Sequence, residues 1–178
     1  MIQRRSFAAA AAFLAASTLF LAFPGPASSS DETPVLTGRV SRERIERAVP
    51  GWVGQTVRST IDEDAAKALT SVPPGARVTV FLGTWCSDSR REVSRFWRDL
   101  DQVGGMVPFD VTYVAVNRAK TVPADLLAGR KIEYVPTFIV ERGGHEVGRV
   151  VEEAPDGIEV DLLALLTGEK SGVLGTGA

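Results

Sequence analysis

A short apolar run, Val78 to Leu82, constrains the fold of this 178-residue chain more than any other segment. The run is continuous rather than alternating, which is typical of a central strand buried on both faces. It is followed by Gly83-Thr84-Trp85-Cys86 and then by apolar residues at helical spacing: Val93, Phe96, Trp97, Leu100 and Val103. A buried strand that leads directly into an amphipathic helix predicts an α/β domain, with Cys86 at the junction.

The segments that follow extend this pattern. Phe109 to Val116 is predicted to be a second buried strand, and Pro123 to Arg130 a short helix with proline in its first turn. Thr137 to Glu141 and Glu146 to Val151 form a predicted hairpin around a glycine turn, and Asp156 is expected to cap a last helix. Right-handed crossovers make the first two strands parallel, and the hairpin adds antiparallel ones. The order therefore predicts a mixed central sheet with helices on both faces.

The first thirty residues have the pattern of a secretory signal peptide. Arg4 and Arg5 precede an apolar stretch from about Phe7 to Phe23, and small residues follow Pro24-Gly25-Pro26. The stretch is short for a membrane span, which needs about 20 strongly apolar residues. Cleavage and export to the periplasm or the exterior are therefore expected, with an uncleaved membrane anchor as the alternative. The two arginines also fit a twin-arginine signal, although two ordinary charges explain them as well.

Four parts of the chain are predicted. Residues 1–30 are the signal peptide, 31–76 a linker and N-terminal extension of the domain, 77–168 its core, and 169–178 a glycine-rich tail expected to be disordered. Within the extension, Ser41 is expected to cap a short helix and Asp62-Glu63-Asp64 to open another, whereas Trp52 to Ile61 has no clear pattern. The formal net charge is −2, and no basic stripe predicts a nucleic-acid partner.

Cys86 is the only cysteine of the chain. Oxidising compartments favour paired structural disulfides, and a single cysteine cannot form one within its own chain. An odd cysteine in an exported protein indicates a free reactive thiol, an intermolecular bond or an inert buried side chain. The cysteine count leaves all three open.

The order of elements, with Cys86 at the end of the first core strand, resembles the thioredoxin fold. Trp85-Cys86 matches that family's Trp-Cys start, and Ser89 occupies the position of its second cysteine. Val135-Pro136-Thr137 is similar to the family's cis-proline loop. The segment from Gly83 to Val93 is also similar to exported bacterial thioredoxin-like proteins with a Cys-x-Asp-Ser motif. The likeness to that second group extends back to Val35.

The resemblance implies roles for several residues. Cys86, Ser89 and Pro136 would be the catalytic positions, and Trp85, Val135 and Thr137 would line the substrate groove. The helix N-terminus favours the thiolate form of the cysteine. Ser89 is expected to donate a hydroxyl hydrogen bond to the sulfur and Arg90 to add positive charge, while the carboxylate of Asp88 opposes the thiolate.

Two departures from the family limit the chemistry. Ser89 replaces the resolving thiol, and the strand before Cys86 has no carboxylate to move protons. A mixed disulfide at Cys86 would then be cleaved by the client's own thiol or by an external low-molecular-weight thiol, or it would be released slowly. The sequence predicts monothiol exchange, by reduction or isomerisation of client disulfides. A redox-inactive binding or chaperone module is the alternative, so it stays open whether the chain is an oxidoreductase, an isomerase or no enzyme.

The other chemically distinctive residues predict no further site. One histidine, one cysteine and scattered carboxylates suggest neither a metal site nor a cofactor. His145 falls in the predicted glycine turn, where a solvated side chain is expected. Trp52 and Trp97 are predicted to pack in the core, and Trp85 to lie beside the sulfur and to be partly exposed.

Overall fold

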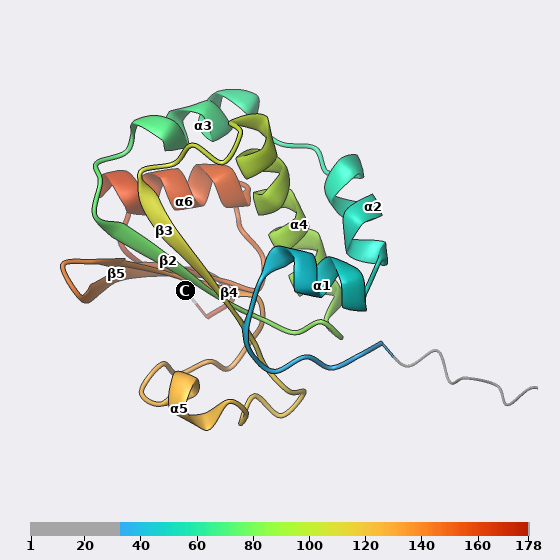
Figure 1. Cartoon of the computed structure of the whole chain (residues 1–178). Helices are drawn as coiled ribbons and strands as arrows, with labels where there is room; N and C mark the ends of the chain where they lie inside the picture. The colour runs from blue at the N-terminus through green and yellow to red at the C-terminus, as the bar shows by residue number, and fades with distance from the viewer. Residues whose placement is uncertain (1–32, 178) are drawn as a thin grey trace, which may run out of the picture. The chain divides into compact units, whose positions relative to one another are not determined.

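The computed structural model describes residues 33–177, so the predicted signal peptide lies outside the described residues (Figure 1). One sheet runs through this part of the chain in the strand order β1-β3-β2-β4-β5-β6. Its strands are β1 (Gly38–Val40), β2 (Ala76–Leu82), β3 (Phe109–Ala115), β4 (Thr137–Arg142), β5 (His145–Val151) and β6 (Gly172–Gly175). The helices are α1 (Arg42–Ala48), α2 (Gly51–Arg58), α3 (Glu63–Ala68), α4 (Ser87–Gln102), α5 (Ala124–Leu127) and α6 (Ile158–Thr167), with a 3₁₀ turn, η1 (Leu69–Ser71).

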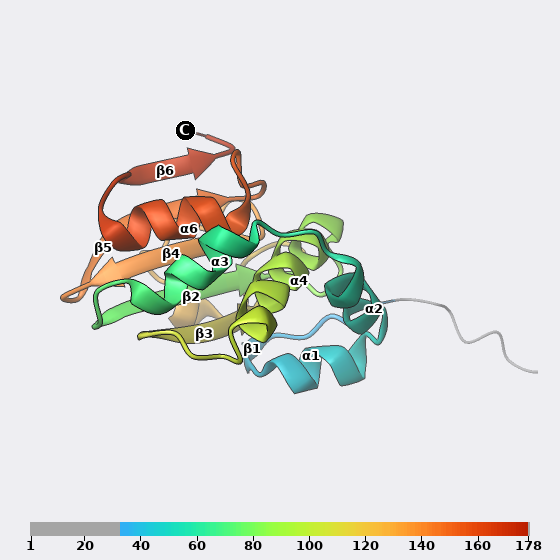
Figure 2. The same cartoon turned by 90° about the horizontal axis from the view of Figure 1, so that it is seen from above.

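Strand β2 occupies the middle of the sheet. It is parallel to β3 and antiparallel to β4, and β5 is antiparallel to β4. β1 adds an antiparallel strand beside β3. Helices α3, α4 and α6 cover one face, and α5 lies on the other (Figures 1 and 2). The predicted fold class, a mixed central sheet with helices on both faces and an N-terminal extension, is confirmed.

The two faces of β2 differ in what covers them. Val78, Val80 and Leu82 pack into the main core beneath α4 and α6. On the opposite face, Phe81 packs with Leu126 and its neighbours from α5, whereas Arg77 is exposed. Because α5 has only four residues, it covers just the part of this face that lies near the end of β2. The rest of that face is open.

The helices of the N-terminal extension join the same core. Ser41 caps α1, as the sequence predicts, and α3 begins in the predicted Asp62-Glu63-Asp64 segment, with Asp62 as its cap. The stretch without a clear pattern forms α2, whose Trp52 is fully buried with its ring centroid 5.4 Å from that of Trp97. The predicted packing role of both tryptophans is confirmed. Within residues 33–177, no helix has the length and apolarity needed to cross a membrane.

The C-terminal residues correct two expectations. The tail expected to be disordered forms strand β6 over Gly172–Gly175, which pairs with the edge of β5. The pairing is possible because Gly148 has no side chain: a Cβ there would lie 2.7 Å from the carbonyl oxygen of Gly172. Asp156 does not cap α6, whose N-cap is Gly157, and instead forms an ion pair with Lys170 at 2.7 Å. That ion pair helps to hold the tail in place.

Charged residues are buried where α4 meets α6. Arg95 donates to the Oε1 atom of Glu159 at 2.7 Å, and the backbone N–H of Asp62 donates to the same atom at 2.7 Å. Asp99 lies one turn after Arg95 and is fully buried, and neither of its oxygens accepts a hydrogen bond from the described residues. Desolvation, reinforced by the charge of Glu159, raises the pKa of Asp99 from its ordinary 3.8 to about 8. Asp99 is therefore a neutral acid at pH 7.

An Asp99→Asn variant tests this protonation state. Between about pH 4 and pH 8 the folded chain holds a proton on Asp99 that the unfolded chain has released. The contribution of Asp99 to the free energy of unfolding should therefore fall by about 1.4 kcal/mol for each unit by which the pH rises. Urea unfolding at pH 5, 6 and 7 should show a shallower fall for Asp99→Asn than for the parent. Equal slopes would mean that Asp99 is ionised in the folded protein.

Candidate functional site

The site is built on the turn between β2 and α4. The backbone N–H of Cys86 donates to the carbonyl of Gly83 at 3.0 Å, and Cys86 is the N-cap of α4. Its Sγ accepts the backbone N–H of Ser89 at 3.5 Å. The sulfur takes the place of the usual capping oxygen, because the turn directs the Cys86 side chain over the free N–H groups of the first helical turn. The residue is half-buried, so solvent can reach it.

The loop before β4 faces the cysteine. The Val135–Pro136 peptide bond is cis, as the resemblance implies, and the thiol of Cys86 donates to the carbonyl oxygen of Val135 at 3.2 Å. Cys86, Trp85 and Val135 line a hollow of about 350 Å³ together with Tyr134 and other side chains. The structure thus brings together three residues that lie up to fifty positions apart in the sequence.

The other two loop positions are less accessible to a ligand. The carbonyl of Pro136 accepts the N–H of Glu152 at 2.7 Å, which joins the loop to the end of β5. Thr137 is almost fully buried, and its hydroxyl donates to the carbonyl of Tyr134 at 2.8 Å. Thr137 borders a different hollow, which it shares with Arg149. Among the groove residues that the sequence predicts, only Trp85 and Val135 lie at the hollow beside the sulfur.

Ser89 differs from its predicted role. Its side chain is fully buried, and its Oγ accepts the backbone N–H of Gly83 at 3.1 Å. The expected hydroxyl bond to the sulfur is replaced by one from the backbone N–H of the same residue. Ser89 therefore closes the turn with its side chain and contacts the sulfur with its backbone.

The charges around Cys86 are partly neutralised. Asp88 pairs with Arg91 at 2.7 Å, so a cation three residues along the helix offsets the carboxylate that was expected to oppose a thiolate. Arg90 is exposed and lines a second hollow, of about 250 Å³, that also touches Cys86 and Trp52. The sequence predicts the tuning role for Arg90, whereas the structure gives the charge pairing with Asp88 to Arg91.

Trp85 is held rigidly beside the sulfur. Its Nε1 donates to the carbonyl of Val116 at 3.0 Å, and the guanidinium of Arg118 lies 5.2 Å from its ring centroid. The ring also packs on Gly83, where a Cβ would approach it to 2.6 Å. The residue is half-buried, as the sequence predicts. It can shield one side of the thiol without closing the hollow.

Thr84 joins the N-terminal extension to this turn, a contact that the sequence does not predict. Its hydroxyl accepts the N–H of Leu36 at 3.1 Å and donates to the carbonyl of Pro34 at 2.5 Å. A single threonine in a loop carries no sequence signal for a bond to a segment about fifty residues away. The cysteine turn is thus attached to the extension on one side and faces the cis-proline loop on the other.

Comparison with known proteins extends the description of the fold. No protein-family model matches the chain. No curated protein matches it either. A protein of unknown function from Pseudomonas aeruginosa is similar in structure, with a TM-score of 0.56 and 15% identity over 75% of this chain and 94% of the other. An HIV epitope scaffold is similar with a TM-score of 0.55 and 17% identity, over 74% and 93% of the two chains.

A thioredoxin f2 from Chlamydomonas reinhardtii matches with the lower TM-score of 0.38 and 23% identity, covering 62% of this chain and 94% of its own. At such identities, similarity in structure concerns the fold alone. The sheet order and the flanking helices define a mixed α/β protein that is compatible with a thioredoxin-like fold. Within residues 33–177, no group of three or more His, Cys, Asp and Glu side chains is arranged to hold a metal ion.

A Ser89→Ala variant separates the structural role of this serine from a role at the sulfur. Without the hydroxyl, the buried N–H of Gly83 loses its acceptor, which should lower the free energy of unfolding by about 1–3 kcal/mol. The rate of Cys86 alkylation in the folded protein should change little, because the backbone N–H of Ser89 remains. The exposed neighbour Ser87→Ala is the control. A large change in alkylation rate with unchanged stability would assign the hydroxyl to the sulfur instead.

Proposed function

We propose that this chain is an exported, thioredoxin-like protein that performs thiol–disulfide exchange through Cys86 as its single nucleophile. The observation that supports the proposal is the position of Sγ, which lies 3.2 Å from the carbonyl of Val135 and borders an open hollow. A sulfur between a helix N-terminus and a cis-proline loop is accessible to an extended disulfide segment. The backbone N–H of Ser89 would stabilise its negative charge after deprotonation.

The reaction begins with the thiolate of Cys86. It attacks one sulfur of a client disulfide, so that a bond forms between Cys86 and that sulfur while the other sulfur leaves as a thiolate. A second client thiolate that attacks the mixed disulfide forms a new client disulfide and returns the Cys86 thiolate, which is isomerisation. If two external thiols act in turn, they release the client as a dithiol and leave as their own disulfide, which is reduction.

The partners in this proposal are client proteins with disulfides or thiols and an external low-molecular-weight thiol. The hollow that contains Val135 would take the client segment, because its loop backbone is next to the sulfur. The hollow lined by Arg90 and Trp52 reaches the same cysteine and offers a small thiol a separate approach. No cofactor, metal or nucleic acid has a role in this scheme.

The alternative is a redox-inactive binding or chaperone module that uses the same hollow. One contact favours it: the thiol hydrogen is engaged by the carbonyl of Val135. In that case Cys86 contributes a capping sulfur and a small apolar volume rather than a nucleophile.

Oxidised glutathione distinguishes the two candidates. In the monothiol scheme, the folded protein should form a one-to-one mixed disulfide at Cys86 faster than the same protein unfolded in urea, as measured by intact mass. Cys86→Ser is the control and should acquire no adduct. If the sulfur reacts only after unfolding, and a client peptide binds Cys86→Ser as well as the parent, the binding module is correct.

A Ser89→Cys variant tests whether resolution is the missing step. Position 89 lies one helical turn from the sulfur, so a thiol there would attack the mixed disulfide within the same molecule. Release of a glutathione adduct should accelerate by on the order of 100-fold or more, because the step becomes intramolecular. Ser87→Cys, which places the thiol at an exposed position, is the matched control. Equal lifetimes in the two variants would contradict the idea that a resolving thiol at position 89 is the missing step.

A further inference from the structure

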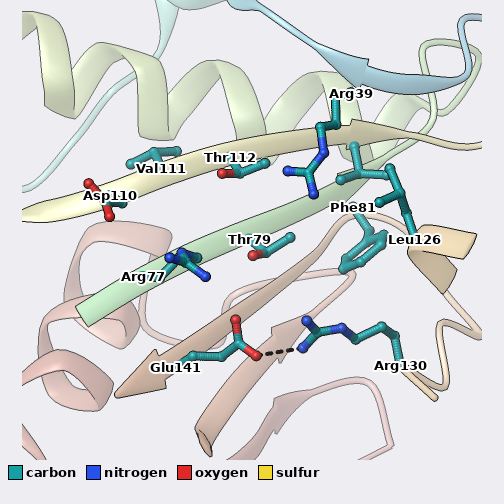
Figure 3. A pocket seen from close by; sticks show the side chains of 11 residues that line it. Arg39, Arg77, Thr79, Phe81, Asp110, Val111, Thr112, Leu126, Arg130 and Glu141 are labelled. Carbon is teal, nitrogen blue, oxygen red and sulfur yellow. Dashed lines mark hydrogen bonds and ion pairs between the residues drawn. The ribbon is translucent and has the colours of Figure 1, made fainter. Parts of the chain in front are cut away.

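The open face of the sheet contains a hollow that the proposed chemistry does not use (Figure 3). Its volume is about 570 Å³, compared with about 350 Å³ for the hollow between Cys86 and Val135. Strands β1 to β4 form the floor, and α5 with the segment after it forms one wall. The volume lies within the range of about 300–1,000 Å³ that is typical of small-molecule sites.

The register of the strands places polar groups in rows across this floor. Arg77 on β2 lies opposite Asp110 on β3 and Glu141 on β4. In the next row, Thr79 lies opposite Thr112. The floor is therefore charged at the beginning of β2 and carries hydroxyl groups in its middle.

The third row is apolar and bordered by an arginine. Phe81 lies opposite Val114, which in turn lies opposite Arg39 on β1. Leu126 of α5 covers the same end of the hollow. Figure 3 shows the side chain of Arg39 extending from β1 over this end of the floor.

The charges in the hollow do not cancel. Glu141 is already engaged by Arg130, at 2.6 Å. In the part of the chain that the structure describes, Arg39 and Arg77 form neither a side-chain hydrogen bond nor an ion pair, and both are exposed. The single remaining carboxylate is that of Asp110, which lies beyond ion-pair distance from either arginine. Two guanidinium groups thus face one carboxylate, in a chain whose net charge is −2.

Thr79 adds a hydrogen-bonding group to the floor of the hollow. Little of the residue as a whole is exposed, but its hydroxyl oxygen is open to the hollow and makes no hydrogen bond to any described residue. The hydroxyl is therefore free to donate to a ligand or to accept from one.

We infer that this hollow binds a small organic anion. Its carboxylate or phosphate groups form ion pairs with Arg39 and Arg77. Its other polar groups form hydrogen bonds with the hydroxyls of Thr79 and Thr112, and its apolar part packs on Phe81. The planar guanidinium group matches both kinds of oxyanion with two parallel hydrogen bonds. The site is separate from the thiol chemistry proposed for Cys86.

The sheet itself argues for a small molecule rather than an added strand. β2, β3 and β4 are each paired on both sides, so the middle of the floor presents no free backbone edge to an extended peptide, and only β1 at its border has an unpaired side. Recognition over the middle of the floor therefore occurs through the side chains that stand on the sheet. Those side chains offer guanidinium groups, hydroxyls and a short apolar surface within one cavity.

Nuclear magnetic resonance titration of the ¹⁵N-labelled protein tests the inference, with glutarate and pyrophosphate as probes and neutral glutaramide as the shape-matched control. Amide shifts in β1, β2 and β3 should saturate with at least one of the two anions and not with glutaramide. Arg39→Gln and Arg77→Gln should each weaken binding by about tenfold or more. Arg44→Gln, an exposed arginine on α1, should leave affinity unchanged.

The outcomes separate this site from the thiol site. Binding of pyrophosphate alone would assign a phosphate ligand, and binding of glutarate alone a carboxylate, and both results support the inference. Cys86→Ser should bind the anion as the parent does, so a failed thiol proposal leaves this test intact. The inference is overturned if neither anion gives saturable shifts at millimolar concentration. It is also overturned if glutaramide binds equally, or if the double variant Arg39→Gln/Arg77→Gln retains the affinity.

Discussion

The hydrogen bond from the backbone N–H of Gly83 to the Ser89 side chain is the contact on which the site depends. It is buried, and it fixes the direction in which the chain leaves β2 and enters α4. Three consecutive residues take their places from this turn: Thr84 binds the N-terminal extension, Trp85 packs back on Gly83, and Cys86 caps the helix. A buried N–H without an acceptor would cost about 1–3 kcal/mol, so the turn and the site are stabilised together.

The unequal covering of the sheet explains why two cavities of different chemistry lie along one strand. Alternate residues of β2 project to opposite faces, and one set is buried under the long helices α4 and α6. The other set faces the short helix α5 and the segment after it, which cover Phe81 but leave Arg77 and the hydroxyl of Thr79 open to the hollow. Because Phe81 and Leu126 belong to the same apolar cluster as Trp85 and Cys86, that cluster forms a boundary between the two cavities.

Much of this arrangement could be predicted from local patterns. The run from Val78 to Leu82, the helix that follows it and the capping residues Ser41 and Asp62 are determined by burial and by hydrogen bonds within a few residues. Contacts between distant segments have no such signal. The hydroxyl of Thr84 donates to the backbone carbonyl of Pro34, and β6 pairs with β5 through backbone groups. Since every residue type has a backbone carbonyl, neither partner can be recognised from its residue type. The rows across the open face follow from strand register, which a single sequence does not specify.

The structure also changes how Ser89 is interpreted. From the sequence, a serine in the position of a resolving cysteine suggests a degenerate redox site. In the fold, its oxygen accepts the N–H of Gly83, a role that a thiol fills poorly because sulfur is a weak acceptor. The serine is therefore explained by the turn whether or not Cys86 reacts, and its presence is not evidence of lost activity. The two proposed functions differ in whether the sulfur of Cys86 reacts. That sulfur accepts the backbone N–H of Ser89, lies against the carbonyl of Val135 and borders an open hollow.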